Sequence, residues 1–146
     1  MRERADDAAP IVWFVDRSLG GREVPAALRA VGAVVETHDA HFSAATPDTE
    51  WLGRAGERGW VVLTKDEAIR RRPLEMAALL SADVAAFILT ARNITGAAMA
   101  ATLVDALPRI ARLVRSRSRP MVATIAASGA ITIHAGGERR GGVARK

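Results

Sequence analysis

Two short apolar runs of this chain each end on an aspartate. Residues 11–15 (Ile-Val-Trp-Phe-Val) lead into Asp16, and residues 60–65 lead into Asp66. A third acid, Asp48, opens a helical pattern between them. Parallel strands end at the same edge of a sheet, and open α/β sheets place their sites there. If both runs are parallel strands, their carboxylates meet, and such a cluster usually holds a proton or binds a metal ion.

Strand and helix patterns alternate along the chain. Strand patterns lie at residues 11–15, 33–37, 60–64, 84–90 and 121–125, followed by a returning strand at 130–134. Helix patterns lie at residues 24–32, 47–58, 67–80 and 95–114. Pro73 is expected to kink or divide the third helix, and Pro108 to interrupt the fourth. The alternation predicts an α/β fold, a three-layer sandwich with a central, mainly parallel sheet and right-handed crossovers.

Length and composition indicate one domain. The 146 residues suit a single core, which we expect at residues 11–134, after an N-terminal extension at 1–10 and before a basic flexible tail at 135–146. There is no cysteine, which excludes disulfides, thiolate nucleophiles and cysteine-ligated zinc. The charged N-terminus lacks a signal-peptide core, and no apolar run approaches the roughly 20 residues of a membrane span. The expected location is the cytoplasm, without membrane attachment.

The formal net charge of +5 is concentrated in clusters. One cluster has no acid within it and comprises Arg109, Arg112, Arg115, Arg117 and Arg119. Another comprises Arg70, Arg71 and Arg72, and the residues from 135 onward form a third. Such clusters suit a polyanion such as nucleic acid, although a solvated helix face would have a similar composition.

The three aspartates are the oxygen ligands that a hard divalent ion such as Mg²⁺ prefers. Metal-assisted phosphodiester cleavage needs no histidine, cysteine or tyrosine, because the ion activates the water and neutralises the developing charge. This chain has no cysteine or tyrosine and three histidines. His38 and His41 flank Asp39, but a zinc site there would lack a third protein ligand.

Asp48 and Glu50 compete for the role of the middle acid. Two residues apart on a helix, they point to nearly opposite sides, so we do not expect both to bind one ion. Thr46 and Pro47 fit an N-cap and a first helical residue, which would place Asp48 in the first turn. The helix dipole favours an acid there even without catalysis, so the choice between the two stays open.

Three segments, taken together, resemble the PIN-like domains of the VapC-type toxin group. They are residues 14–19 (Phe-Val-Asp-Arg-Ser-Leu), 48–52 (Asp-Thr-Glu-Trp-Leu) and 61–66 (Val-Val-Leu-Thr-Lys-Asp). In that family an aspartate closes the first strand, an acid begins a middle helix, and Thr-Lys-Asp follows a later strand. The resemblance covers residues 11–90. It implies a metal-dependent ribonuclease whose catalytic residues and Mg²⁺ ligands are Asp16, Asp48 and Asp66, with Mn²⁺ as a substitute ion.

The resemblance also implies partners. RNA is the expected substrate, a cognate antitoxin the expected inhibitor, and a homodimer is compatible with the pattern. The expected RNA phosphate contacts are Arg17, Lys65, Arg70 and Arg71. Many PIN domains carry a further acid near the end of the following strand, where this chain has only Thr90 and Asn93. We therefore expect a single ion.

Two other classes of function compete with the nuclease. A non-catalytic PIN-like module could bind RNA or a partner through its basic surface, and it would depend on the arginines of residues 109–119 rather than on the acids. A receiver-like or phosphatase-like domain would also use aspartates at strand ends. It is disfavoured because Asp16 has no neighbouring acid and no Asp-x-Asp motif follows it.

Overall fold

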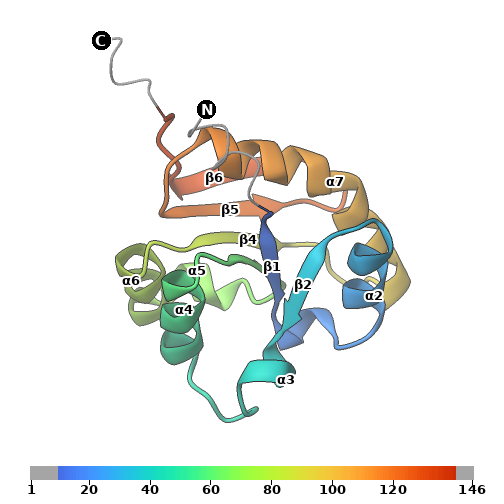
Figure 1. Ribbon diagram of the computed structural model, residues 1–146, viewed down its shortest axis with the longest axis horizontal. Coiled ribbons are helices and arrows are strands. Elements are labelled where there is room, and N and C mark those ends of the chain that lie inside the picture. The colour runs from blue at the N-terminus through green and yellow to red at the C-terminus, as the bar shows by residue number, and fades with distance from the viewer. Residues whose placement is uncertain (1–9, 141–146) are drawn as a thin grey trace.

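A six-stranded sheet forms the centre of the molecule in a computed structural model that describes residues 10–140 (Figure 1). Its strands are β1 (Val12–Val15), β2 (Val34–Thr37), β3 (Val61–Thr64), β4 (Ala85–Leu89), β5 (Met121–Ile125) and β6 (Ile131–Gly136). Their order across the sheet is β2-β1-β3-β4-β5-β6. All neighbours pair in parallel except β5 and β6, which form an antiparallel hairpin. The predicted strands and their mainly parallel arrangement are confirmed.

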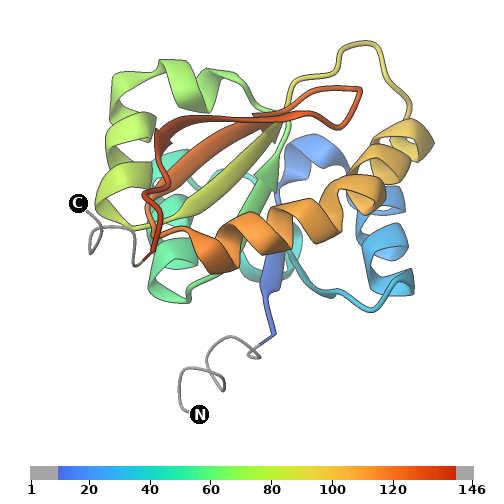
Figure 2. The same ribbon diagram turned by 90° about the horizontal axis from the view of Figure 1, so that it is seen from above.

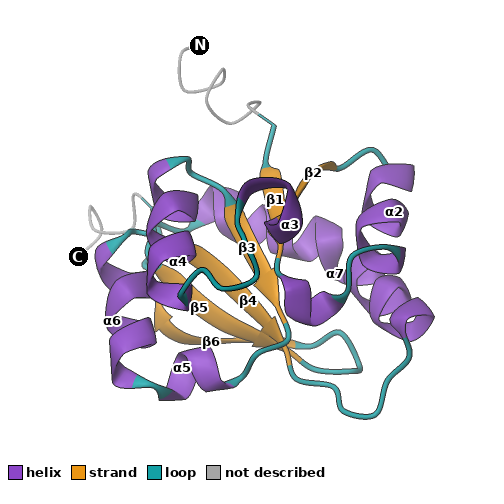
Figure 3. Ribbon diagram, turned by 90° about the horizontal axis from the view of Figure 1, so that it is seen from below, coloured by secondary structure: helices purple, strands orange, loops and turns teal. Residues whose placement is uncertain are grey.

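Helices cover both faces of the sheet (Figure 3). Helices α2 (Glu23–Ala30) and α7 (Gly96–Ser116) pack together on one face. Helices α4 (Asp48–Glu57), α5 (Ala68–Arg71) and α6 (Pro73–Ser81) lie on the other. Two short elements, η1 (Arg17–Leu19) and α3 (His38–His41), follow β1 and β2. The three-layer sandwich is thus confirmed, and no helix among residues 10–140 is long and apolar enough to cross a membrane.

Alternation along β1 divides the core between the two faces. Trp13 and Val15 pack into the cluster beneath α2 and α7, whereas Phe14 packs on the opposite side. There the ring of Phe14 stacks on Trp60, with centroids 5.5 Å apart, and lies 5.4 Å from the ring of Trp51 on α4. This aromatic cluster holds α4 against the strand that ends at Asp16.

The two prolines inside helical patterns behave differently. Pro73 divides the expected helix at 67–80 into α5 and α6, as predicted, and it is the first residue of α6. Pro108 was expected to interrupt the last helix, but α7 runs through it without a break. The helix is buried on both sides of the proline, at Ala106 and Ile110. This packing against the sheet compensates for the hydrogen bond that proline cannot make.

Residues 135–140 pair with the rest of the fold, whereas a flexible tail was predicted to begin at residue 135. Strand β6 continues to Gly136. Beyond it, the Gly137 N–H donates to Pro120 O at 2.9 Å, and the Arg140 N–H donates to Ser116 O at 3.0 Å. The predicted boundary therefore lies too early, because backbone pairing with the segment before β5 continues past the strand. The rest of the predicted tail (141–146) and of the N-terminal extension (1–9) lies outside the described residues.

A glycine in α4 tests the close contact between α4 and α6. A methyl group at Gly56 would overlap the carbonyl oxygen of Ala82, whereas one at Gly53 on the same helix would meet open space. We expect Gly56→Ala to lower the free energy of unfolding by about 1–3 kcal/mol through overpacking. Gly53→Ala should raise it by up to about 1 kcal/mol, because alanine favours the helix. Chemical denaturation measures both, and equal effects would contradict the close approach.

Candidate functional site

Asp16 is a buried carboxylate at the end of β1, with 8% of its surface exposed. Its Oδ1 accepts a hydrogen bond from the Arg17 N–H at 2.8 Å. Its Oδ2 accepts from the hydroxyl groups of Ser18 at 2.8 Å and Thr64 at 2.7 Å. Thr64 is the last residue of β3. The carboxylate is therefore fixed in position and joins the carboxyl ends of the two central strands.

The same network extends to Asp66. Thr64 Oγ1 accepts a hydrogen bond from the Asp66 N–H at 3.1 Å, and Ser18 Oγ accepts one from the Lys65 N–H at 2.8 Å. Asp66 Oδ1 in turn accepts from the Ala68 N–H at the start of α5, at 3.0 Å. The backbone that carries Asp66 is thus tied to the side chains that hold Asp16.

Asp48 is the first residue of α4, since Pro47 rather than Thr46 occupies the N-cap position. The predicted helix start was therefore one residue early, although Asp48 still lies in the first turn. Asp48 Oδ1 accepts a hydrogen bond from the Trp51 indole N–H at 2.8 Å. A pocket of about 320 Å³ brings Asp48 and Asp16 to one surface, and Ser18, His38, Thr46 and Trp51 are among its other lining residues. Glu50 is exposed and does not line this pocket.

The pKa of Asp48 responds to its burial and to the surrounding acids. Burial raises the pKa of Asp48, and the negative charges of Asp16, Asp66 and Glu75 raise it further, while the hydrogen bond from Trp51 opposes the shift. Glu75, in the first turn of α6, is a fourth acid that the sequence analysis missed. Its only sequence signal was its place two residues after Pro73, which is common in ordinary helices.

The acids form an incomplete ligand set that nevertheless fits a hard divalent cation. Among residues 10–140, no three His, Cys, Asp or Glu side chains converge closely enough to make a full protein site. Mg²⁺ does not require one, because it usually binds through one or two carboxylates and keeps several waters. Asp16 and Asp48 share a pocket, and a bound cation would oppose both the burial and the repulsion that raise the pKa of Asp48. Asp66 adds negative charge beside them.

The four residues expected to contact RNA phosphates differ in whether an acidic side chain already pairs with them. Arg17 Nε donates to Asp39 Oδ1 at 3.2 Å, and Arg71 forms an ion pair with Glu67 at 3.2 Å. Lys65 and Arg70 form no ion pair within the described part of the chain. The buried Nε of Arg70 also lacks a hydrogen-bond partner there. Lys65 and Arg70 are thus the more available cations.

The two neighbouring histidines make separate contacts. His41 Nε2 lies 2.7 Å from Glu36 Oε1. His38 is buried, lines the pocket of Asp16 and Asp48, and packs edge-on against Trp51 with ring centroids 5.8 Å apart. Its Nδ1 has no hydrogen-bond partner in the described structure. His38 is a pocket residue that the sequence analysis considered only as a zinc ligand.

Comparison with known proteins agrees with this architecture. A family model described as a PIN like domain matches residues 11–91, the segment that contains all three aspartates. The chain is also 33% identical over 106 residues to the "Putative ribonuclease VapC45" of Mycobacterium tuberculosis (strain ATCC 25618 / H37Rv), a match that covers 70% of this chain and 77% of that protein. No solved structure matches the chain significantly. With its α/β sandwich and acids at the carboxyl edge, the chain belongs to the PIN-like domain family, in its VapC-type group.

Proposed function

We propose that this chain is an endoribonuclease, the toxin of a toxin–antitoxin pair, and that it hydrolyses RNA phosphodiester bonds with a bound Mg²⁺. Mn²⁺ would serve as a substitute ion. The observation that carries the proposal is the pocket that Asp16 and Asp48 share, with the backbone of Asp66 joined to Asp16 through the Thr64 hydroxyl. The match to a relative named as a ribonuclease supports it.

Each acid has a distinct part in this proposal. Asp16 and Asp48 would hold the ion, and the hydrogen bonds from Ser18 and Thr64 keep the Asp16 carboxylate in place before RNA arrives. A divalent ion there would supply a water of lowered pKa and positive charge for the phosphate oxygens. Asp66 strengthens the negative field that attracts the cation.

Lys65 and Arg70 would bind the RNA backbone beside the acids, because neither is committed to an ion pair in the described structure. Contacts of this kind position the RNA without reading its sequence. Arg17 and Arg71 would contribute less to RNA binding, because each would first have to break its ion pair, with Asp39 and Glu67 respectively.

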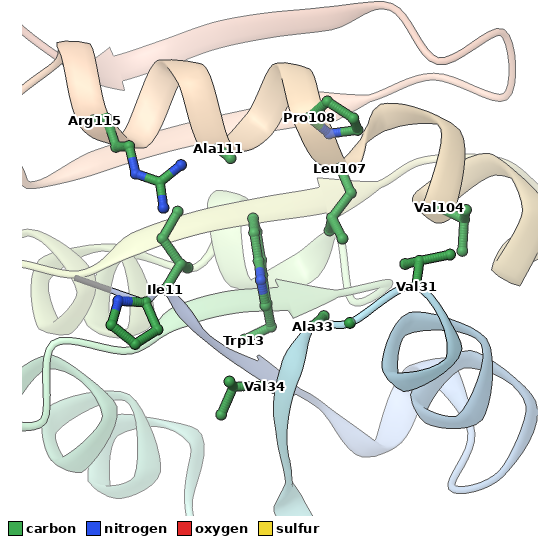
Figure 4. Close-up of a pocket in the computed structure, with 12 residues that line it drawn as sticks. Ile11, Trp13, Val31, Ala33, Val34, Val104, Leu107, Pro108, Ala111 and Arg115 are labelled. Atoms are coloured by element: carbon green, nitrogen blue, oxygen red, sulfur yellow. The ribbon is translucent and has the colours of Figure 1, made fainter. Parts of the chain in front are cut away.

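The antitoxin would bind an apolar groove of about 470 Å³ between α7 and the starts of β1 and β2. In Figure 4, side chains of α7 face Ile11 and Trp13 across this groove. Val31 and Val34 at its rim are 56% and 45% exposed. Arg115 lies at one end and suits an acidic residue in a mostly apolar partner segment. The homodimer stays a prediction.

Asparagine substitutions test the catalytic role of the acids. Asp16→Asn should lower the rate of Mg²⁺-dependent cleavage of an RNA pool by more than about 100-fold because it removes a ligand, and Asp66→Asn by about 10–100-fold, the loss typical of groups around the ligands. Asp105→Asn, at an exposed position on α7, is the matched control and should cleave normally. Thermal melts establish that each variant is folded. Cleavage that persists in both site variants, or in chelator, would contradict the proposal.

The raised pKa of Asp48 predicts a pH-dependent stability. The folded protein keeps a proton on Asp48 at pH values where the unfolded chain has lost it, so this residue's contribution to stability falls as pH rises from below 3.8 through the higher folded pKa. In chelator at pH 7.5, Asp48→Asn should therefore melt at a higher temperature than wild type, and the difference should vanish near pH 3.

Mg²⁺ should reverse that difference, because it would stabilise the wild type more than Asp48→Asn by binding only the folded site. Differential scanning calorimetry measures both effects. A variant that melts at or below the wild-type temperature in chelator at pH 7.5 would show that burial and repulsion together do not destabilise the charged form of Asp48.

Arg70 and Arg71 provide a matched pair for the phosphate contacts. Arg70→Gln should weaken RNA binding and lower the slope of log affinity against log salt by about 0.7–0.9, the value for one phosphate contact. Arg71→Gln removes the same charge from the next residue and should have a smaller effect, because Arg71 is paired with Glu67. Salt titrations of RNA binding by fluorescence anisotropy measure this difference. Equal slopes for the two variants would argue against a specific role for Arg70.

A further inference from the structure

Four arginines gather at the edge of the sheet opposite the acids, and we call this set the arginine surface. It comprises Arg117, Arg119, Arg139 and Arg140. Helix α7 returns from the end of β4 to the start of β5, so its last turns lie at the edge where the parallel strands begin. Asp16 and Asp66 lie where β1 and β3 end. Figure 2 shows the end of α7 and the end of the described chain after β6 side by side.

Backbone pairing fastens the two segments of the arginine surface together. Arg117 and Arg139 form an antiparallel bridge. The Ser118 N–H donates to Glu138 O at 2.7 Å, and Arg140 Nε donates to Arg117 O at 3.0 Å. Arginines about twenty residues apart in the sequence are therefore held next to each other by the fold.

Few acids compensate the arginine surface among the described residues. None of its four arginines forms an ion pair with any residue between 10 and 140, whereas Arg17, Arg71, Arg72 and Arg109 each do. Burial lowers the pKa of Arg119, and the positive charge of Arg140 lowers it further, while Asp83 acts in the opposite direction. Glu138 is the one acid within the paired segments. Uncompensated like charges of this kind favour a polyanion.

The C-terminal end of α7 accounts for only part of this clustering. A helix dipole favours cations at this end, where Arg117 is the C-cap and the Arg140 guanidinium donates to the Arg117 carbonyl oxygen. Arg119 and Arg139 lie beyond the C-cap in the sequence, so the helix end does not explain all four arginines.

The arginine surface is far enough from the acids to need a long ligand. Arg119 Nη1 donates to Trp60 O at 3.3 Å, immediately before β3, and Asp66 lies beyond the other end of that strand. Six residues of extended chain separate Trp60 from Asp66, a distance on the order of 20 Å. At the rise of about 3.4 Å per nucleotide of a stacked helical strand, about six nucleotides cover this distance, and a more extended strand needs fewer.

We propose that the arginine surface is a second RNA-binding surface, which holds the phosphate backbone of the substrate at a distance from the cleaved bond. This inference rests on the proposed function, because it takes RNA as the substrate. It differs from a purely non-catalytic module in that both edges of the sheet contact one RNA. Because the arginine surface and the acids lie at opposite edges, we expect the protein to prefer RNA that is long enough to reach both.

The test measures RNA binding in chelator, where cleavage cannot interfere. Wild type is compared with the triple variant Arg117→Gln, Arg139→Gln, Arg140→Gln and with a charge-preserving triple variant that has lysine at the same positions. For an RNA of about 30 nucleotides, the glutamine variant should bind at least about tenfold more weakly and lose about 2 units of salt slope, at roughly 0.7 per contact. The lysine variant should keep most of both, because each position retains its charge. Melting temperatures check that both variants are folded.

Two results would overturn the inference. One is a glutamine variant with the affinity and salt slope of wild type. The other is tighter wild-type binding to a DNA duplex of equal length than to the RNA, which would assign the arginine surface to DNA. These outcomes are independent of the proposed nuclease activity. If Asp16→Asn and wild type are equally inactive but the glutamine variant loses RNA binding, the arginine surface stands and the nuclease proposal fails.

Discussion

The carboxylate of Asp16 is the group on which the whole site depends. A carboxylate that is 8% exposed is costly unless it is hydrogen-bonded, and Asp16 accepts three hydrogen bonds from residues at the ends of two different strands. The hydroxyl groups that satisfy it also receive the backbone N–H groups of Lys65 and Asp66. One buried charge therefore sets the spacing of β1 and β3 and the positions of the residues that follow both strands.

The direction of the strands separates the two kinds of charge. In a parallel sheet every strand ends at the same edge, so Asp16 and Asp66 come together although 50 residues separate them. Every crossover helix returns to the opposite edge, so the arginines that follow α7 gather there. An RNA bound at both edges would cross the molecule in a defined orientation, with its cleaved bond at the acidic edge. In the proposed function, the topology of the fold would thus separate the positions of binding and cleavage.

Local patterns in the sequence predicted the strands, the helices and the convergence of Asp16 and Asp66, because a buried parallel strand is a short apolar run and its end is marked by the next polar residue. The sequence did not predict the features that depend on packing. Helix α7 continues through Pro108 because the sheet holds both sides of it, and Glu75 approaches the acids only through the contact of α6 with α4. The pairing of Arg117 with Arg139 is likewise a long-range contact without a local signal.

The choice of Asp48 over Glu50 shows how the core determines the chemistry of the site. Both acids lie in the first turn of α4, and the helix dipole favours them equally. The difference is the rotation of α4, which is set by Trp51 packing on Phe14 and by the Trp51 indole donating to Asp48. Burying Trp51 turns Asp48 toward Asp16 and leaves Glu50 in solvent. The core therefore opposes the repulsion between the acids, and in the proposed nuclease a bound cation would relieve this repulsion.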